Sequence, residues 1–140
     1  DAAEPDGRGT RFHDHGAHGT DPMSKYRAVP TTVNGFRFAS KAEARRYQEL
    51  LLLGKAGEIR NLELQPRFAI TSAGVRVADY VADFRYEERY PSQACNGMCL
   101  CAHWRWRDVV EDVKGVKTPV YRLKKKLVEA QHGITIREVR

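Results

Sequence analysis

Apolar residues recur with helical spacing in two stretches of the chain, and each stretch carries its own start and stop signals. The first predicted helix has Ser40 as its N-cap, and Glu43 three residues later completes a capping box. The apolar positions that follow are Tyr47, Leu50 and Leu51. We expect Gly54 to end this helix, because glycine is the residue that most often follows a helix C-terminus.

The second predicted helix lies near the end of the chain. It follows Thr118, which is a good N-cap, and begins with Pro119, which suits the first helical position. Its apolar stripe consists of Val120, Leu123, Leu127 and Ala130. We expect the helix to end at Gly133, for the same reason as the first helix.

Period-two alternation predicts strands between and after these helices. The predicted strands span residues 67–71, 75–86, 104–116 and 134–139. A polar insertion that contains the cysteines, residues 87–103, separates the second strand from the third. The chain therefore reads helix, three strands, helix, strand, and this order predicts an α/β fold.

Length and composition limit the class of protein. The chain has 140 residues, of which 41% are hydrophobic, so we expect one domain with a real core. Its apolar runs are far shorter than the about 20 residues that span a bilayer, so we expect no membrane partner. All three cysteines lie between residues 95 and 101, which argues against a disulfide framework and for a reducing compartment such as the cytoplasm.

Charge is distributed unevenly along the chain. Residues 1–22 carry two basic and five acidic side chains, so residues 23–140 carry 22 basic and 13 acidic ones. We interpret residues 1–22 as a disordered tail or as a leader ahead of a natural start at Met23, and residues 23–140 as a single domain. A domain this basic suggests a polyanionic partner, most often a nucleic acid.

Strand alternation can bring chemically active residues together. If the strands at 75–86 and 104–116 pair as a long hairpin, Asp83 and Asp112 become neighbours on one face. Lys114 points the same way as Asp112. Two carboxylates this close repel each other, and a hard divalent cation bound between them removes that penalty.

Glu43 has two interpretations. Its helical position aligns it with Tyr47 and Leu50, the face expected to pack on the sheet, where a carboxylate needs a partner. The capping box alone would explain it. Taken together with Asp83 and Asp112, Glu43 is better interpreted as part of a site.

This ordered set of residues resembles the PD-(D/E)XK nuclease superfamily. Its members carry a glutamate on the first core helix, an aspartate at the end of one strand and Asp/Glu-X-Lys on the next. Here these are Glu43, Asp83 and the tripeptide Asp112-Val113-Lys114. Ala82 departs from the pattern, because it stands where the motif name has proline. The resemblance covers residues 24–140 and implies a restriction-endonuclease-like core, with a central mixed sheet flanked by helices.

A narrower resemblance is to small phage and prophage endonuclease-like proteins, distant relatives of phage Holliday-junction resolvases. It is carried by residues 24–26, 38–43, 64–66 and 111–115. This resemblance implies a metal-dependent DNA endonuclease, selective for branched or junction DNA, in the cytoplasm of a bacterial host. The alternative is a non-catalytic DNA-binding module that keeps a nuclease-like fold, and a homodimer is left open.

The resemblance assigns a role to each site residue. Asp83, Asp112 and the Val113 carbonyl would hold Mg²⁺ or Mn²⁺, and Glu43 would hold a metal-bound water or a second ion. Lys114 would orient the attacking water and stabilise negative charge in the transition state.

Two further residues are candidates for supporting the site. Gln65 lies where related nucleases carry a glutamine, although a polar turn residue before Pro66 is an equally good explanation. Asp79 is a reserve metal ligand. We expect both Asp79 and Asp108 to lie at the rim and to pair with arginines, because they share the face of Asp83 and Asp112 but lie further along it.

DNA contacts are expected from basic residues on the two helices and at the front of the domain. These are Lys117, Arg122, Lys124, Lys125 and Lys126 on the second helix, Lys41, Arg45 and Arg46 on the first, and Lys25 and Arg27 before it. The excess of basic over acidic groups favours phosphate contacts over a merely solvated face.

The insertion carries a second candidate metal site. Its four potential zinc ligands are Cys95, Cys99, Cys101 and His103. Their spacing is not that of a standard zinc finger, so ordinary loop cysteines are the alternative to structural zinc. A third interpretation of the chain is a zinc-stabilised protein-interaction domain, but it would not explain why Asp83, Asp112 and Lys114 share a face. Trp104 and Trp106 could stack on bases, but burial against the sheet or a dimer partner is the favoured interpretation.

Overall fold

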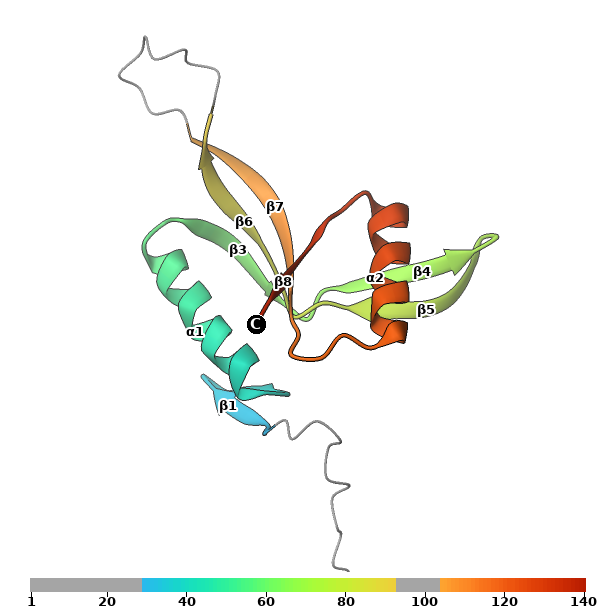
Figure 1. Cartoon of the computed structure of the whole chain (residues 1–140). Helices are drawn as coiled ribbons and strands as arrows, with labels where there is room; N and C mark the ends of the chain where they lie inside the picture. The colour runs from blue at the N-terminus through green and yellow to red at the C-terminus, as the bar shows by residue number, and fades with distance from the viewer. Residues whose placement is uncertain (1–28, 93–103) are drawn as a thin grey trace, which may run out of the picture.

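A computed structural model describes residues 29–92 and 104–140 (Figure 1). In chain order its elements are β1 (Thr31–Val33), β2 (Phe36–Phe38), α1 (Lys41–Lys55), β3 (Ile59–Leu64), β4 (Arg67–Ser72), β5 (Val75–Val81), β6 (Phe84–Pro91), β7 (Trp104–Val113), α2 (Pro119–His132) and β8 (Ile136–Val139). Most of the predicted insertion, with its candidate zinc ligands, lies outside the described residues.

A mixed four-stranded sheet forms the centre of the protein. Its strand order is β3-β6-β7-β8, with β8 parallel to β7 and the other neighbours antiparallel. Helices α1 and α2 lie to either side of the line of strands in Figure 1. The predicted α/β class with a mixed sheet is therefore confirmed. Without the two small hairpins β1–β2 and β4–β5, the element types follow the predicted order of helix, three strands, helix, strand, but the first of those strands is β3, which was not predicted, whereas the predicted strand at 67–71 is β4 of a hairpin.

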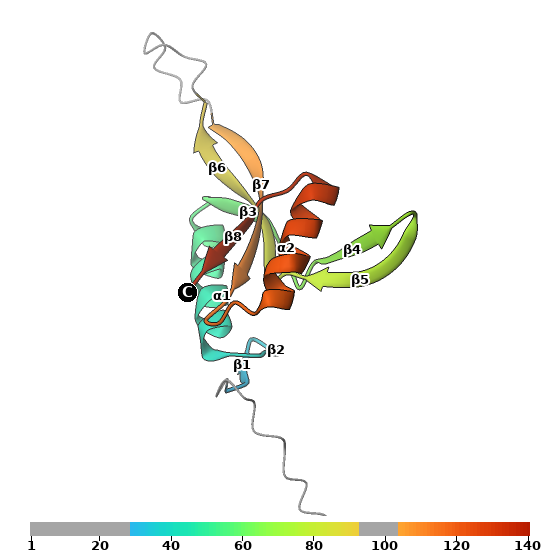
Figure 2. The ribbon, with the colours of Figure 1, turned by 45° about the vertical axis from the view of Figure 1, so that its right-hand side comes forward.

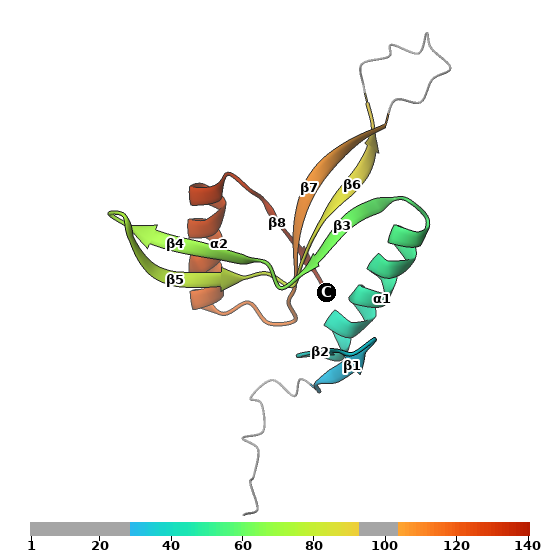
Figure 3. The same ribbon diagram turned by 180° about the vertical axis from the view of Figure 1, so that it is seen from behind.

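The predicted strand at 75–86 is wrong as a single element. The chain bends between β5 and β6, and these two strands belong to different sheets. The opposite arm bends at the same level, where Gln65 has a positive φ of 52° and Pro66 lacks a backbone N–H. Backbone hydrogen bonds join the two bends, from Gln65 N to Asp83 O at 3.0 Å and from Ala82 N to Pro66 O at 3.1 Å. The result is one long hairpin with a kink, whose two parts are the β3–β6 pair and the β4–β5 pair (Figure 3). Asp83 lies at the kink, between the end of β5 and the start of β6.

Two core clusters occupy opposite faces of the sheet, as strand alternation requires. The cluster under α1 consists of Phe38, Ala44, Tyr47, Leu50, Ile59, Phe84, Tyr86, Val109 and Val113. The cluster under α2 consists of Phe68, Ile70, Tyr80, Ala82, Val110, Val128 and Ile136. The β4–β5 hairpin contributes to this second cluster, and Figure 2 shows the hairpin extending past α2. Each face also buries one carboxylate that is fully inaccessible to solvent, Glu111 or Asp112.

Helix starts agree with the predictions, but one helix end does not. Ser40 caps α1 by accepting a hydrogen bond from the Glu43 amide at 3.2 Å, and Thr118 caps α2 in the same way. Gly133 ends α2 in the left-handed conformation. Gly54, by contrast, lies inside α1, which continues to Lys55 and is followed by Ala56 as C-cap.

Several strand limits also differ from the predictions. β6 continues to Pro91, so the break begins later than residue 87, and β7 ends at Val113 rather than at residue 116. β8 begins at Ile136 rather than at residue 134. Strand β3 and the β1–β2 hairpin were not predicted at all, although β3 is an edge of the central sheet.

Neither α1 nor α2 combines the length and hydropathy that a bilayer-spanning helix needs.

Candidate functional site

The kink in the long hairpin and the end of β7 bring two carboxylates together. Phe84 pairs with Glu111 in the β6–β7 ladder, and the Asp83 amide donates to the Glu111 carbonyl at 3.1 Å. Asp83 therefore lies opposite Asp112, which is the register expected from the sequence. The Asp83 side chain keeps 16% of its surface exposed, whereas Asp112 is fully buried.

Each carboxylate is held by one directed hydrogen bond. Asp83 Oδ2 accepts from the Val113 amide at 2.7 Å, and Asp112 Oδ2 accepts from the Tyr80 hydroxyl. Lys114 Nζ lies 2.6 Å from Asp112 Oδ1 and 3.8 Å from Asp83 Oδ2. Its approach to Asp112 Oδ1 is an ion pair without the angles of a good hydrogen bond. Asp83, Asp112 and Lys114 thus form one charged cluster, which we call the Asp–Asp–Lys site.

Burial and the neighbouring charges shift the pKa values of Asp83 and Lys114. Burial, reinforced by the neighbouring Asp112 carboxylate, raises the pKa of Asp83 well above its ordinary value. Burial also disfavours the charged form of Lys114, but the two aspartates outweigh it and raise the pKa of Lys114. Lys114 therefore remains a cation at neutral pH, and one lysine does not fully compensate two buried carboxylates.

Glu43 takes part in capping α1, as predicted, but its carboxylate reaches the amide before the N-cap rather than that of Ser40. Its carboxylate accepts hydrogen bonds from the Ala39 amide at 3.1 Å and from the Ser40 hydroxyl at 3.2 Å. Among the residues that the structure describes, no three acidic, histidine or cysteine side chains are grouped closely enough to hold a metal ion. Glu43 is near enough for its charge to raise the pKa of Lys114, although it is not a third member of a ligand cluster.

The two candidate supporting residues occupy different places. Gln65 adjoins the site through its backbone, which pairs with Asp83 at the kink. Asp79 forms an ion pair with Arg76, and Asp108 forms one with Arg85 at 3.0 Å. Both aspartates therefore pair with arginines, as the sequence suggested for rim charges.

Several residues expected to contact DNA already have partners in the protein. The Arg46 guanidinium binds both carboxylate oxygens of Glu111, at 2.6 and 3.0 Å. Lys117 and Lys125 both pair with Glu138, and Lys124 donates to the Asp79 carbonyl. Lys41, Arg45, Arg122 and Lys126 are exposed, whereas Lys25 and Arg27 lie outside the described residues.

Sequence reasoning did not find the contacts that buried polar side chains make with the neighbouring carboxylates Glu111 and Asp112. Tyr86 donates to Glu111 at 2.7 Å on the α1 side, and Tyr80 donates to Asp112 on the α2 side. Along one straight strand over residues 75–86, alternation would put Tyr80 on the face opposite Asp83. The kink at Ala82 and Asp83 breaks that alternation and is the reason Tyr80 reaches the site.

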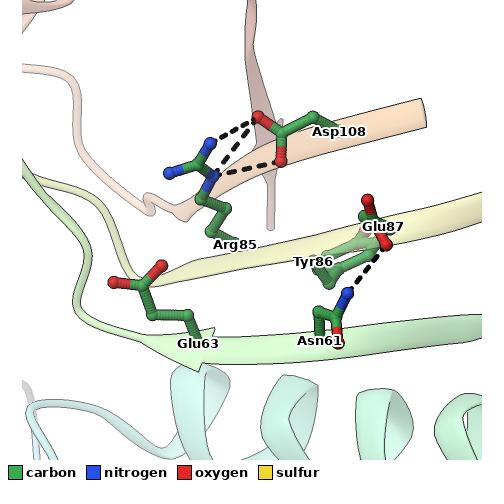
Figure 4. Close-up of a pocket in the computed structure, with 6 residues that line it drawn as sticks. All are labelled: Asn61, Glu63, Arg85, Tyr86, Glu87 and Asp108. Carbon is green, nitrogen blue, oxygen red and sulfur yellow. Dashed lines mark hydrogen bonds and ion pairs between the residues drawn. The ribbon is translucent and has the colours of Figure 1, made fainter.

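A shallow hollow of about 210 Å³ lies over β3, β6 and β7 (Figure 4). Its lining residues are Asn61, Glu63, Arg85, Tyr86, Glu87 and Asp108. The ion pair of Arg85 with Asp108 and the hydrogen bond from Asn61 to Glu87 cross it. Three carboxylates against one arginine give this hollow an acidic lining, which does not suit a phosphate.

The tryptophans at the start of β7 are covered by arginines. The Arg89 guanidinium lies 4.3 Å from the Trp104 ring centroid, and the Arg60 guanidinium lies 4.2 Å from that of Trp106. Trp106 is half-buried, whereas Trp104 is 46% exposed. Such cation–π contacts occupy aromatic faces that could otherwise stack on bases.

Comparison with known proteins gives a family but no characterised relative. No curated protein and no solved structure matches the chain. A family model matches residues 23–140, which include every described helix and strand. The chain therefore belongs to the family described as "Protein of unknown function (DUF1064)".

Proposed function

We propose that this chain is a metal-dependent DNA endonuclease of the PD-(D/E)XK type, with a restriction-endonuclease-like core. The observation that carries the proposal is the Asp–Asp–Lys site, where Asp83 at a strand kink faces Asp112 and Lys114 at the end of the adjacent strand. Cleavage of branched or junction DNA, of the phage or prophage type, is the substrate preference we propose.

The donor set fits magnesium or manganese. Mg²⁺ is commonly held by one or two carboxylates, with waters and substrate phosphates completing its shell, so a third protein carboxylate is not required. Asp83 and Asp112, with the Val113 carbonyl, would hold the ion. The raised pKa of Asp83 supports this, because burial and then the neighbouring Asp112 carboxylate disfavour its negative charge, and a bound cation would offset that cost. A bound ion would polarise the phosphate and lower the pKa of a water.

Lys114 acts as a fixed positive charge in this proposal. The aspartates raise its pKa, so the ammonium stays protonated and does not act as a general base. Phosphodiester hydrolysis builds negative charge on the phosphoryl oxygens, which an oriented ammonium stabilises. The Lys114 side chain is 30% exposed, so it is not sealed inside the protein.

DNA binding is assigned first to the exposed basic side chains. Arg122 and Lys126 on α2 and Arg45 on α1 are exposed and can reach phosphates. Lys117, Lys124 and Lys125 would have to exchange internal partners for phosphates. We expect these three to contribute less to affinity.

A cleavage assay tests the proposal. The protein is incubated with linear duplex, nicked, flapped and four-way-junction DNA, in Mg²⁺, in Mn²⁺ or in EDTA. Cleavage that requires metal is the expected result, and faster cutting of the branched DNAs would support structure selectivity. Binding to DNA without cleavage in either metal would instead identify a non-catalytic DNA-binding module.

Glu43→Gln separates capping from a role in the site. The two contacts use different oxygens of Glu43. Glutamine keeps one oxygen, which can accept from the Ala39 amide, and its NH2 group can donate to the Ser40 hydroxyl, so we expect the melting temperature to change little. If the Glu43 charge holds a metal-bound water or a second ion, cleavage falls by orders of magnitude.

Ser40→Ala is the control for Glu43→Gln. It removes the cap and should cost about 1 kcal/mol of stability, while the cleavage rate per folded molecule stays unchanged. Melting and cleavage are measured for both variants. Wild-type cleavage by Glu43→Gln would reduce the site to Asp83, Asp112 and Lys114.

A further inference from the structure

Tyr80 approaches the Asp–Asp–Lys site from outside the central sheet. It lies on β5, in the two-stranded hairpin, and only 4% of its surface is exposed. Its hydroxyl donates to Asp112 Oδ2. The Tyr80 ring packs near Tyr121 of α2, with 6.3 Å between ring centroids. The hairpin and α2 therefore hold this hydroxyl in place.

The hydrogen bond determines how the Asp112 carboxylate is turned. Rotation about the terminal bond of an aspartate is broad, so a buried carboxylate needs a contact to select one orientation. Tyr80 occupies Oδ2, which leaves Oδ1 facing Lys114 Nζ at 2.6 Å.

The same arrangement orders the second carboxylate. Asp83 Oδ2 is engaged by the Val113 amide, so each aspartate has one oxygen held by the protein. An ion held by the two aspartates would bind the other oxygens, Asp83 Oδ1 and Asp112 Oδ1, and would share Asp112 Oδ1 with the Lys114 ammonium. Of the two holding contacts, the one to Asp83 comes from the backbone of β7, whereas the one to Asp112 depends on a single side chain.

We propose that Tyr80 is a positioning residue, which orients Asp112 for metal binding from the β4–β5 hairpin. This inference rests on the proposed nuclease function. It assigns the hairpin a part in the site, because the hairpin carries the group that orders one of the two carboxylates. Mutation of a residue that hydrogen-bonds to a metal-binding carboxylate typically lowers metal affinity or activity by roughly 10- to 100-fold.

Tyr80→Phe tests the inference, with Tyr86→Phe as the matched control. Tyr86 is also buried, and its hydroxyl donates to Glu111, the residue adjacent to Asp112, on the other face of the sheet. Both substitutions remove one buried hydroxyl from a buried carboxylate. The affinity for Mn²⁺ is measured by electron paramagnetic resonance, alongside melting temperature and cleavage kinetics in Mn²⁺.

We expect Tyr80→Phe to weaken Mn²⁺ binding by roughly 10- to 100-fold, and Tyr86→Phe to leave it unchanged. The cleavage rate of Tyr80→Phe should recover in part at high Mn²⁺ concentration. Mn²⁺ affinity of Tyr80→Phe equal to or above that of the wild type would overturn the inference, as would an equal loss in Tyr86→Phe. If the wild type binds Mn²⁺ but does not cut DNA, the proposed function fails, and the Mn²⁺ affinities still decide the role of Tyr80.

Discussion

Asp112→Asn and Asp83→Asn should each abolish DNA cleavage, while DNA binding without metal persists or becomes tighter. Each substitution keeps the size of the side chain and removes one of the two adjacent negative charges. With one charge gone, the pair no longer attracts a divalent cation strongly, so catalysis is lost. DNA binding does not need that charge and gains from its removal, because the carboxylates repel phosphate.

Asp83→Asn carries an additional expectation for stability. Because the pKa of Asp83 is raised, its ionised form is disfavoured in the folded protein at neutral pH. A neutral asparagine avoids that cost and can still accept from the Val113 amide. The melting temperature at neutral pH should therefore rise in the absence of metal, even though activity is lost.

Asp108→Asn is the control for these two variants. Asp108 lies on the same strand and face as Asp112, but it is exposed and paired with Arg85. Cleavage rates in Mg²⁺ and Mn²⁺ and DNA-binding anisotropy in EDTA are measured for the three variants. Near wild-type cutting by Asp83→Asn or Asp112→Asn would remove that residue from the site, and inactivity of Asp108→Asn would extend the site along β7.

Glu111→Ala should destabilise the protein more than the loss of any exposed charged side chain. Glu111 is fully buried and accepts from Arg46 and Tyr86. Removing one member of a buried ion pair leaves the other charge uncompensated and costs about 3–5 kcal/mol. The loss should fall near the lower end of that range, because the Arg46 side chain is 18% exposed and retains Glu49.

Glu49→Ala provides the matched comparison in urea unfolding. Glu49 also pairs with Arg46, at 2.9 Å, but its side chain is 50% exposed. Exposed pairs contribute about 0–1 kcal/mol, so Glu49→Ala should unfold close to the wild type. Equal midpoints for Glu49→Ala and Glu111→Ala would contradict a structural role for the buried pair.

Adjacent residues of β7 therefore serve different purposes. Glu111 faces α1, where Arg46 and Tyr86 satisfy its charge and tie the helix to the sheet. Asp112 faces the opposite side, where its neighbours are Asp83 and the ammonium of Lys114. Full compensation on one face and incomplete compensation on the other distinguish a structural carboxylate from a candidate metal ligand.

The sequence by itself determined the features that depend on neighbouring residues. Ser40 and Thr118 cap their helices as predicted, because a cap needs only the amides of the following turn. Alternation along β7 by itself puts the adjacent residues Glu111 and Asp112 on opposite faces. The expected neighbourhood of Asp83 and Asp112 depended on the two strands pairing, and the observed pairing of Phe84 with Glu111 places them side by side.

Tertiary structure decided everything that depends on which elements pack together. The kink at Asp83 requires the opposite arm to bend at Gln65 and Pro66, so alternation along one strand could not reveal it. That bend brings Tyr80 into the site. The β3 edge strand lacks regular alternation because its pairing with β6 is irregular between Arg60 and Glu63, where Asn61 has a positive φ of 55°.

Helix α2 shows the same limit for burial. Its predicted apolar stripe lies on the exposed side, with Val120 63% and Leu123 60% exposed, whereas Val128 is fully buried. Val128 is buried because both the β4–β5 hairpin and the central sheet pack against that face of α2. Tyr121 packs against the same cluster, and Lys114 Nζ lies 5.7 Å from its ring centroid. Helical periodicity predicts which residues share a face, but the neighbouring elements determine which face is buried. In this protein the neighbouring elements also determine which side chains complete the candidate site.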